Sequence, residues 1–144
     1  MKGPLLLYYQ LDEGAAHPRQ AYKHDAGIDL ALKHDLTVPV GAHRVGDTGV
    51  HVAVPRDHVG MVFVRSSTGI KNHLVLSNGT GIIDSGFRGQ IKISLHNTGD
   101  TTQHIQAGDY IAQLVIIPIA PNEIAEVREL DHTQRGTNAI GSSD

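Results

Sequence analysis

The sequence predicts an all-β fold, either a sandwich or a barrel, built from many short strands. The 144 residues include 12 Val and 13 Ile against 12 Leu, and this excess of β-branched side chains favours strands over helices. Short apolar runs recur between Gly, Pro, Asn and Asp residues, which are typical of turns. No segment has the periodicity of a long amphipathic helix. With four Tyr, two Phe and no Trp, the core is expected to be aliphatic.

The predicted strands follow these apolar runs in order. Val50–Val54 and Ile91–Leu95 alternate apolar with other residues, as a half-buried strand does. Ile111–Ile119 is apolar nearly throughout, which predicts a strand covered on both faces. One short helix is expected near Thr68–Asn72, weakened by its glycine. The remaining predicted strands are Leu5–Tyr9, Ile28–Leu32, Leu36–Val38, Gly60–Val64, Leu74–Leu76, Gly81–Ile83, His104–Ile105 and Ala125–Glu129.

Composition excludes several classes of function. A net charge of −3 argues against general nucleic-acid binding, and the absence of Cys excludes disulfides, thiol nucleophiles and Cys-ligated zinc. The ten His are scattered without a zinc-binding spacing, so no zinc site is predicted. No apolar run approaches the ~18 residues of a membrane span, and the first residues lack a signal-peptide pattern. We therefore expect a soluble, cytoplasmic protein.

The composition changes near Asp131, after which the chain carries a single large apolar residue. Such a tail buries too little apolar surface to offset the entropy lost on ordering. The sequence therefore predicts a core domain over residues 1–132 and a flexible C-terminal arm over residues 133–144, ordered only by a ligand or a neighbouring chain.

Two polar clusters in the first half of the chain could carry chemistry. Asp25–Leu30 is either a turn followed by a strand or the place where a carboxylate lies near a metal. Val64–Lys71 follows a strand and combines hydroxyls, a glycine and basic side chains. That combination suits a phosphate, although an ordinary helix cap with solvated charges has the same composition.

Two further clusters lie in the second half. Asn78–Lys92 reads as a β-hairpin around Ser85–Gly89, with Asp84 at its shoulder as a candidate general base. Phe87 either packs in the core or stacks on a ligand ring, and its glycine neighbours favour stacking slightly. Gln113 is the one strongly polar residue in an apolar strand. It is therefore either a satisfied core amide or an amide that orients a water or a carboxylate.

Together these clusters resemble the trimeric dUTPases, a family with five ordered motifs. The third and fourth matches are the most specific, and the resemblance spans nearly the whole chain. The matching segments are AGIDL (26–30), RSSTGIK (65–71), NGTGIIDSGFRGQI (78–91), GDYIAQL (108–114) and a degraded RGTNAIGSS (135–143). The resemblance implies a distorted jelly-roll, or β-clip, barrel and a homotrimer with shared active sites. It implies hydrolysis of dUTP to dUMP and pyrophosphate with Mg²⁺ on the triphosphate.

The resemblance also implies residue roles. Asp84 would activate the attacking water, Gln113 would hydrogen-bond near that water and the phosphate, and Asp29 would reach Mg²⁺ through coordinated water. Phosphates would be held by Arg65, Ser66 and Ser67. The uracil and sugar would be bound by Asn78, Ile82, Ile83, Lys92 and Phe87, and the arm of a third chain would close with Arg135, Ile140, Gly141 and Ser142.

Three departures from the family pattern matter. Phe87 stands where the family has Tyr, which keeps the ring face but loses the hydroxyl. Ser67 stands where a Gly usually follows the phosphate-binding Ser, which changes the backbone freedom of that loop. Thr137–Ile140 replaces two glycines and an aromatic residue, so the arm is stiffer and Ile140 cannot stack as a ring does. Weaker activity or a different closure of the arm is expected.

Two alternatives remain open at this point. The related dCTP deaminases share the fold, and Arg65–Ser67 and Asp84–Phe87 lean toward them, but Ser94 stands where their proton-shuttling Glu belongs. A non-catalytic regulatory binding protein with a dUTPase fold would explain the altered fifth motif. It would not explain why Asp29, Asp84 and Gln113 are all present.

Overall fold

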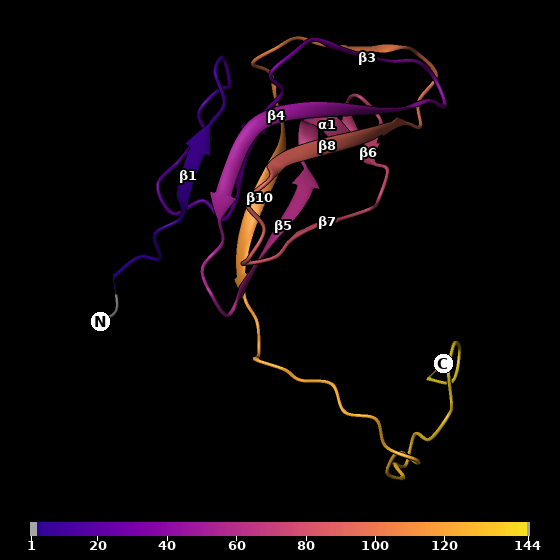
Figure 1. Ribbon diagram of the computed structural model, residues 1–144. Coiled ribbons are helices and arrows are strands. Elements are labelled where there is room, and N and C mark those ends of the chain that lie inside the picture. The colour runs from indigo at the N-terminus through magenta and orange to yellow at the C-terminus, as the bar shows by residue number, and fades with distance from the viewer. Residues whose placement is uncertain (1–2, 144) are drawn as a thin grey trace.

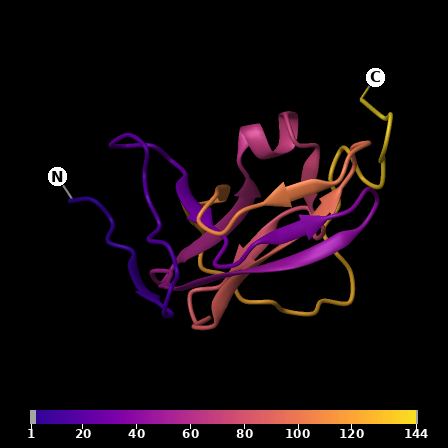
Figure 2. The same ribbon diagram turned by 90° about the horizontal axis from the view of Figure 1, so that it is seen from above.

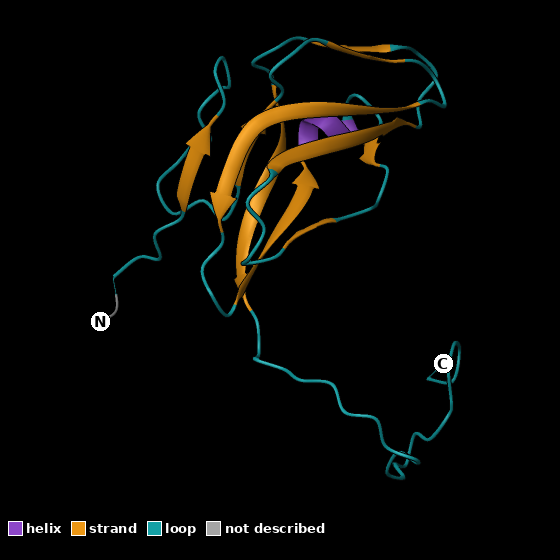
Figure 3. Ribbon diagram, viewed as in Figure 1, coloured by secondary structure: helices purple, strands orange, loops and turns teal. Residues whose placement is uncertain are grey.

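The computed structural model describes residues 3–143, which form mainly antiparallel β-structure with one short helix (Figures 1 and 3). The helix α1 spans Ser66–Ile70, between β5 and β6. The strands are β1 (Tyr8–Leu11), β2 (Ile28–Ala31), β3 (Leu36–Val38), β4 (His43–Ala53), β5 (His58–Val64), β6 (Leu74–Leu76), β7 (Gly81–Ile83), β8 (Gln90–Asn97), β9 (Gln103–Ile105) and β10 (Tyr110–Pro118).

Two four-stranded sheets carry the fold, and Figure 2 shows them as layers seen from above. The first has the order β1-β4-β8-β6 and the second the order β2-β10-β5-β7, while β3 and β9 form a separate pair. The core is aliphatic, as the sequence predicts. Alternate residues of each strand point to the same side, so the apolar residues of a strand can share the side that faces the core. Its fully buried large side chains are Leu30, Leu32, Val38, Val50, Leu74, Ile91, Ile93, Leu95 and Leu114.

The segment from Asn78 to Gly89 is not the hairpin that the sequence predicts. The strand before the 84–89 turn, β7, pairs with β5, whereas the strand after it, β8, pairs with β4 and β6. The chain therefore leaves the first sheet after β6, adds an edge strand to the second sheet, and returns to the first. A turn between two short apolar runs has the same local pattern whether the runs pair with each other or with different sheets.

Several predicted boundaries are corrected. Ala125–Glu129 is not a strand, and in residues 119–143 the chain has neither helix nor strand. The first strand begins at Tyr8 instead of Leu5, β4 begins seven residues before Val50, and α1 begins two residues before Thr68. In β10, Ala112 and Leu114 are buried, while Val115–Ile117 are only half-buried, so the predicted cover on both faces applies to half of the strand.

After β10 the chain extends away from the sheets (Figure 1). Its apolar side chains Ile124, Val127, Leu130 and Ile140 are all exposed. Among residues 3–143, no helix has the length and hydrophobicity needed to cross a lipid bilayer.

A bulge in β4 changes the register in which the following residues of this strand pair with β8. The pairing with β8 shifts register between Asp47 and His51, and Gly49 adopts a left-handed conformation with φ of 67°. Thr48 is fully buried there. Its hydroxyl donates to the Ile91 carbonyl at 2.6 Å and accepts from the Val50 N–H at 3.1 Å.

Replacing Thr48 with Val should lower the free energy of unfolding by about 2 kcal/mol, because the isosteric side chain leaves two buried backbone groups without their partner. Urea denaturation measures this difference. The exposed Thr102→Val is the matched control and should change stability little. An equal loss in both variants would mean that the hydroxyl does not hold the bulge.

Candidate active site

A polar cleft of about 360 Å³ lies where β2, β10 and the junction of β5 with α1 meet. It combines two carboxylates, a guanidinium, a hydroxyl and an amide, which is a set suited to a charged ligand. The cleft is lined by Ala21, Asp25, Ala26, Gly27, Asp29, Arg65, Ser66 and Gln113.

Strand register explains why these residues meet. Gln113 in β10 has Asp29 of β2 as its Cα partner on one side and Phe63 of β5 on the other. Arg65 follows two residues after Phe63, directly before α1. Three of the four predicted clusters therefore contribute to one cleft, and the structure brings Asp29, Arg65, Ser66 and Gln113 together.

The Asp29 carboxylate is the electrostatic centre of this cleft. The residue is only 7% exposed and lies between two guanidinium groups. Arg65 Nε is 3.4 Å from its Oδ1, and Arg19 Nε is 3.7 Å from its Oδ2. Burial of the carboxylate beside these cations limits the cost of desolvating its charge.

Arg19 and Tyr110 belong to this arrangement and were missed by the sequence analysis. The Arg19 guanidinium stacks over the Tyr110 ring, 3.9 Å from its centroid, and the Arg65 Nη1 donates to the Tyr110 carbonyl at 3.0 Å. A backbone bridge between Arg19 and Asp29 brings the first arginine to the cleft. No local sequence signal marks such a bridge, because it joins a loop residue to a strand.

Gln113 is bonded as a core amide and also reaches the cleft. Its Nε2 donates to the Val64 carbonyl at 3.3 Å, as a satisfied core amide does. Its side chain crosses directly over Gly27, so closely that a Cβ at position 27 would overlap with the amide oxygen. The side chain is half-buried and remains at the cleft wall.

The short helix α1 brings the Ser66 side chain to the cleft. Ser66 and Ser67 are exposed, whereas Thr68 is buried and packs inward. Arg65 is the N-cap residue, and its side chain makes no capping hydrogen bond. The N–H groups of the first turn thus lack a side-chain cap and are available to an anion.

The residues from Asn78 to Lys92 form a second group elsewhere on the surface. Asp84 is exposed, and its carbonyl accepts from the Phe87 N–H at 3.1 Å. The Phe87 ring is 44% exposed and folds over Gly89, so it does not pack in the core. Ile82 is exposed and Ile83 half-buried on the edge strand β7.

Asn78, which precedes β7, and Lys92 on β8 are also exposed. Asn78 Nδ2 donates to the Thr80 carbonyl at 3.4 Å, and Lys92 Nζ lies 3.6 Å from Asp47 Oδ1.

The structure does not bring Asp84 into the polar cleft of the same chain. Asp84 follows Ile83, and the partner of Ile83 in β5 is Gly60. The partner of Gln113 in β5 is Phe63, three residues further along that strand. At about 3.4 Å per residue, the rows of Ile83 and Gln113 are about 10 Å apart along the strand, and Arg65 lies further still.

The arm residues are likewise not at the cleft of their own chain. Arg135 Nε donates to the Asn138 carbonyl at 3.0 Å within the arm, and Ile140, Gly141 and Ser142 are exposed. Figure 1 shows this end of the chain well away from the sheets.

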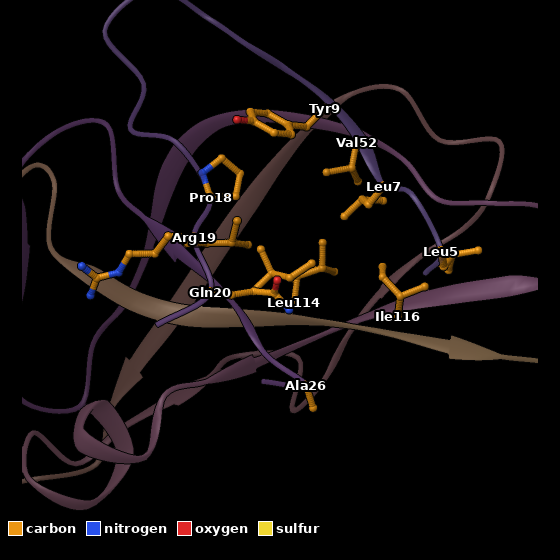
Figure 4. A pocket seen from close by; sticks show the side chains of 12 residues that line it. Leu5, Leu7, Tyr9, Pro18, Arg19, Gln20, Ala26, Val52, Leu114 and Ile116 are labelled. Carbon is orange, nitrogen blue, oxygen red and sulfur yellow. The ribbon is translucent and has the colours of Figure 1, made fainter. Parts of the chain in front are cut away.

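A second hollow, of about 390 Å³, is mostly apolar and adjoins the charged cleft at Arg19 (Figure 4). It runs between the N-terminal segment and β10, and aliphatic side chains make most of its wall. Its lining residues are Leu5, Leu7, Tyr9, Pro18, Arg19, Gln20, Ala26, Ile28, Leu30, Val52, Leu114 and Ile116. With few polar groups, this groove is suited to burying apolar surface and not to hydrolytic chemistry.

Comparison with known proteins points to one family. The dUTPase family model matches residues 13–144. The chain is 42% identical over 129 residues to the deoxyuridine 5'-triphosphate nucleotidohydrolase of Cutibacterium acnes, covering 89% of this chain and 85% of that protein.

Solved structures give the same result. A mutant dUTPase of Staphylococcus bacteriophage 80alpha with dUpNHpp is similar with a TM-score of 0.87 and 29% identity, covering 96% of this chain and 98% of the other. A mutant dUTPase from phage phi11 of S. aureus, solved to describe the coordination of a structural Mg(II) ion, has a TM-score of 0.78 and 30% identity. That match covers 87% of this chain and 98% of the other.

Replacing Gly27 with Ala should displace the Gln113 side chain, because the new methyl group and the amide oxygen would occupy the same space. We expect a loss of about 1–3 kcal/mol in the free energy of unfolding, typical of overpacking, and a broken hydrogen bond to Val64 in a crystal structure. Gly69→Ala, where the added carbon meets only ordinary contacts, is the control. An unmoved Gln113 in the Gly27 variant would contradict this account.

Proposed function

We propose a mechanism for this chain, which belongs to the dUTPase family and hydrolyses dUTP as an enzyme of nucleotide metabolism. The observation that carries the mechanism is the cleft in which Asp29, Arg65, Ser66 and Gln113 converge. The roles of individual residues, the assembly and the metal go beyond the family assignment. We infer them from this geometry. The family match leaves no observation that favours deamination of dCTP or a purely regulatory role.

The active form is a homotrimer in which neighbouring copies complete each site. Its first support is the separation of Asp84 from the polar cleft within one chain, since a base that far from the phosphates cannot activate water beside them. The second support for the homotrimer is apolar surface that a neighbouring copy would bury. This surface comprises the groove of Figure 4, the half-buried end of β10 and the exposed side chains Ile124, Val127 and Leu130. We further assign the sheets to a distorted jelly-roll barrel.

The polar cleft binds the triphosphate. A triphosphate carries about four negative charges, while the chain as a whole is acidic, so binding depends on cations gathered locally. Arg65 and Arg19 supply two of them at the cleft, and Lys71 follows α1. The exposed hydroxyls of Ser66 and Ser67 and the uncapped first turn of α1 donate to phosphate oxygens.

The donors of the cleft fit Mg²⁺ bound mainly through phosphate and water. Mg²⁺ prefers oxygen ligands, usually keeps several waters and needs only one or two carboxylates. Within residues 3–143, no three His, Asp or Glu side chains gather as a metal cluster, and Asp29 keeps carboxylate oxygens at the cleft. Asp29 would hold the ion through coordinated water, and the bound ion would neutralise charge on the phosphates.

The edge strand β7 of a neighbouring copy reads the base. On its outer side, this strand has no partner strand among the described residues, so backbone donors and acceptors at Ile82 and Ile83 can pair with the uracil edge. Asn78 precedes this strand and Lys92 lies on β8, and both contact the nucleotide in our assignment. The exposed ring of Phe87 stacks on the deoxyribose.

Asp84 is the general base. Its carboxylate takes a proton from a water that attacks phosphorus, yielding dUMP and pyrophosphate, and Gln113 of the adjoining copy orients that water beside the phosphate. Charge that develops on the phosphoryl oxygens is stabilised by Arg65 and the hydroxyls already in place.

Residues 1–132 form the core domain, and the arm of a third copy, residues 133–144, closes over the γ-phosphate with Arg135, Gly141 and Ser142. Ile140 contacts the base without stacking. The cytoplasmic location stays a prediction from the sequence.

Replacing Asp84 with Asn should lower kcat by at least about 100-fold while dUpNHpp still binds, because the amide keeps the shape of the side chain but cannot accept the proton. Pyrophosphate release from dUTP measures the rate, with ammonia release from dCTP assayed in parallel. The exposed Asp100→Asn is the control and should keep full activity. An active Asp84→Asn enzyme would remove Asp84 from the mechanism.

Mixing inactive variants tests whether two copies form each site. Asp84→Asn and Gln113→Ala chains, unfolded and refolded together, should regain activity, because a site can take its base from one chain and its amide from the other. If the chains assemble at random, half of the sites receive an intact Asp84 and half of those also receive an intact Gln113, so roughly a quarter of the sites would be complete. The same variants refolded separately are the control. No recovery, or a monomer by light scattering, would contradict the composite site.

Deleting residues 133–144 should leave the trimer intact but reduce kcat sharply, because closure of the arm completes the charge around the γ-phosphate and excludes water. In the full chain, dUpNHpp should protect the bond after Arg135 from trypsin, and dUMP should not, since only the former carries the γ-phosphate. Equal protection by both ligands would show that the altered arm does not respond to the γ-phosphate.

A further inference from the structure

His51 in β4 joins two segments that are far apart in the sequence. Its Nδ1 lies 2.8 Å from the carbonyl oxygen of Arg88, at the end of the 84–89 turn. Its Nε2 lies 3.0 Å from Oδ1 of Asp12, in the loop after β1. Asp12 is itself fixed to the β4 bulge, because its N–H donates to the Gly49 carbonyl at 2.8 Å. The imidazole thus connects the bulge of β4 with the segment that carries Asp84 and Phe87.

Both oxygens that face the ring are acceptors. A neutral imidazole carries one N–H, so it can satisfy only one of them, whereas the imidazolium donates to both. The geometry therefore selects the charged form. In agreement, the pKa of His51 is raised above its ordinary value of 6.5, chiefly by the hydrogen bond to the Arg88 carbonyl. Burial opposes this rise, and the Asp12 carboxylate adds to it.

The other groups around the ring leave this conclusion unchanged. Tyr8 and Tyr9 of β1 and the stem of Arg88 line the same shallow groove as His51. The Arg88 guanidinium turns back to the Ser85 and Phe87 carbonyls, at 2.8 and 2.9 Å, and so donates to its own turn.

Two further neighbours complete these surroundings. The Lys33 stem and Asp12 both lie close to Gly49, which places this basic residue in the neighbourhood of the acidic partner of His51. On β8, the residue opposite His51 is the uncharged Gln90, whose side-chain oxygen accepts from the Gly49 N–H at 3.0 Å.

The Arg88 carbonyl is an effective point at which to fix the turn. β7 holds the beginning of the turn against β5, and the Phe87 N–H returns to the Asp84 carbonyl. Phe87 precedes Arg88 directly, and its exposed ring rests on Gly89. A bond to the Arg88 carbonyl thus restrains the end of the turn next to the ring, whereas Asp84 is restrained mainly by β7.

We propose that His51 is a positioning residue for the nucleotide site, holding the 84–89 turn and the Phe87 ring in place when both of its nitrogens are protonated. The consequence for binding rests on the role proposed above for Phe87. A group whose pKa is raised in the folded protein stabilises the native arrangement below its unfolded pKa, and the effect is lost as pH rises through the folded pKa. Nucleotide affinity therefore falls as His51 loses its proton.

Binding of dUpNHpp to the full-length protein, measured by calorimetry from about pH 6 to about pH 8.5, tests this proposal. His51→Asn keeps one donor but does not titrate. The matched control is His104→Asn, because His104 Nδ1 also makes a hydrogen bond, to Thr37 Oγ1 at 3.2 Å, within the separate β3–β9 pair. Ionisation of the ligand affects all three proteins equally.

We expect the Kd of the wild type to rise about fivefold more across this range than the Kd of His51→Asn, as for one lost hydrogen bond. The His104→Asn control should follow the wild type, and kcat should show the smaller difference because β7 restrains Asp84. The same pH dependence in wild type and His51→Asn would overturn the proposal.

Two measurements without nucleotide separate this proposal from the role of Phe87. NMR of the imidazole nitrogens should show both protonated at about pH 6, and amide exchange over residues 85–89, corrected for intrinsic rates, should accelerate as His51 titrates. A singly protonated ring at low pH, or exchange indifferent to His51→Asn, would refute the bridge. If Phe87→Ala alone leaves binding unchanged while these signals persist, the stacking role fails and the bridge stands.

Discussion

The pairing of β10 with β2 on one side and β5 on the other is the constraint on which the site depends. This register aligns Asp29, Gln113 and Phe63 in one row and sets Arg65 and α1 just beyond it. A one-residue slip of β10 would turn the Gln113 side chain to the opposite face and bring an apolar neighbour to the cleft. The buried Ala112 and Leu114 on either side resist that slip, because it would remove them from the core.

The same register underlies the way in which, in the proposed mechanism, an acidic chain binds a polyanion. Asp29 is nearly buried, and its charge is offset by Arg65 and Arg19, which approach from different elements. Tyr110 fixes both arginines, one through its ring and the other through its carbonyl, so that neither is a freely moving surface cation. Pre-positioned guanidinium groups lose less conformational entropy when a phosphate arrives than mobile side chains would. Three motif residues, Asp29, Arg65 and Tyr110, therefore act as one charged unit with Arg19, which lies outside every motif.

The sequence predicted the strands of the core because burial on one or both faces leaves a pattern in the residues themselves. It failed where the outcome depends on partners. Ala125–Glu129 has a strand-like apolar spacing but pairs with no strand among residues 3–143. The turn at Ser85–Gly89 does not reveal that its flanking strands join different sheets. The motif residues at the cleft were recognisable from their order. Arg19 and His51 were not, since each acts through a contact that only the folded chain creates.

The separation of the proposed base, Asp84, from the proposed phosphate cleft has a physical consequence for the isolated chain. Asp84 is exposed on one copy and remains hydrated, while the cleft is open and its cations face water. Electrostatic interactions are weak in such surroundings because the effective dielectric constant is high. Assembly would change both conditions together, burying apolar surface at the groove beside β10 and bringing the base to a less hydrated site. The apolar contacts that hold the copies together would then also strengthen the charge interactions used in hydrolysis. In this arrangement, association of the chains is itself a step in building the active site.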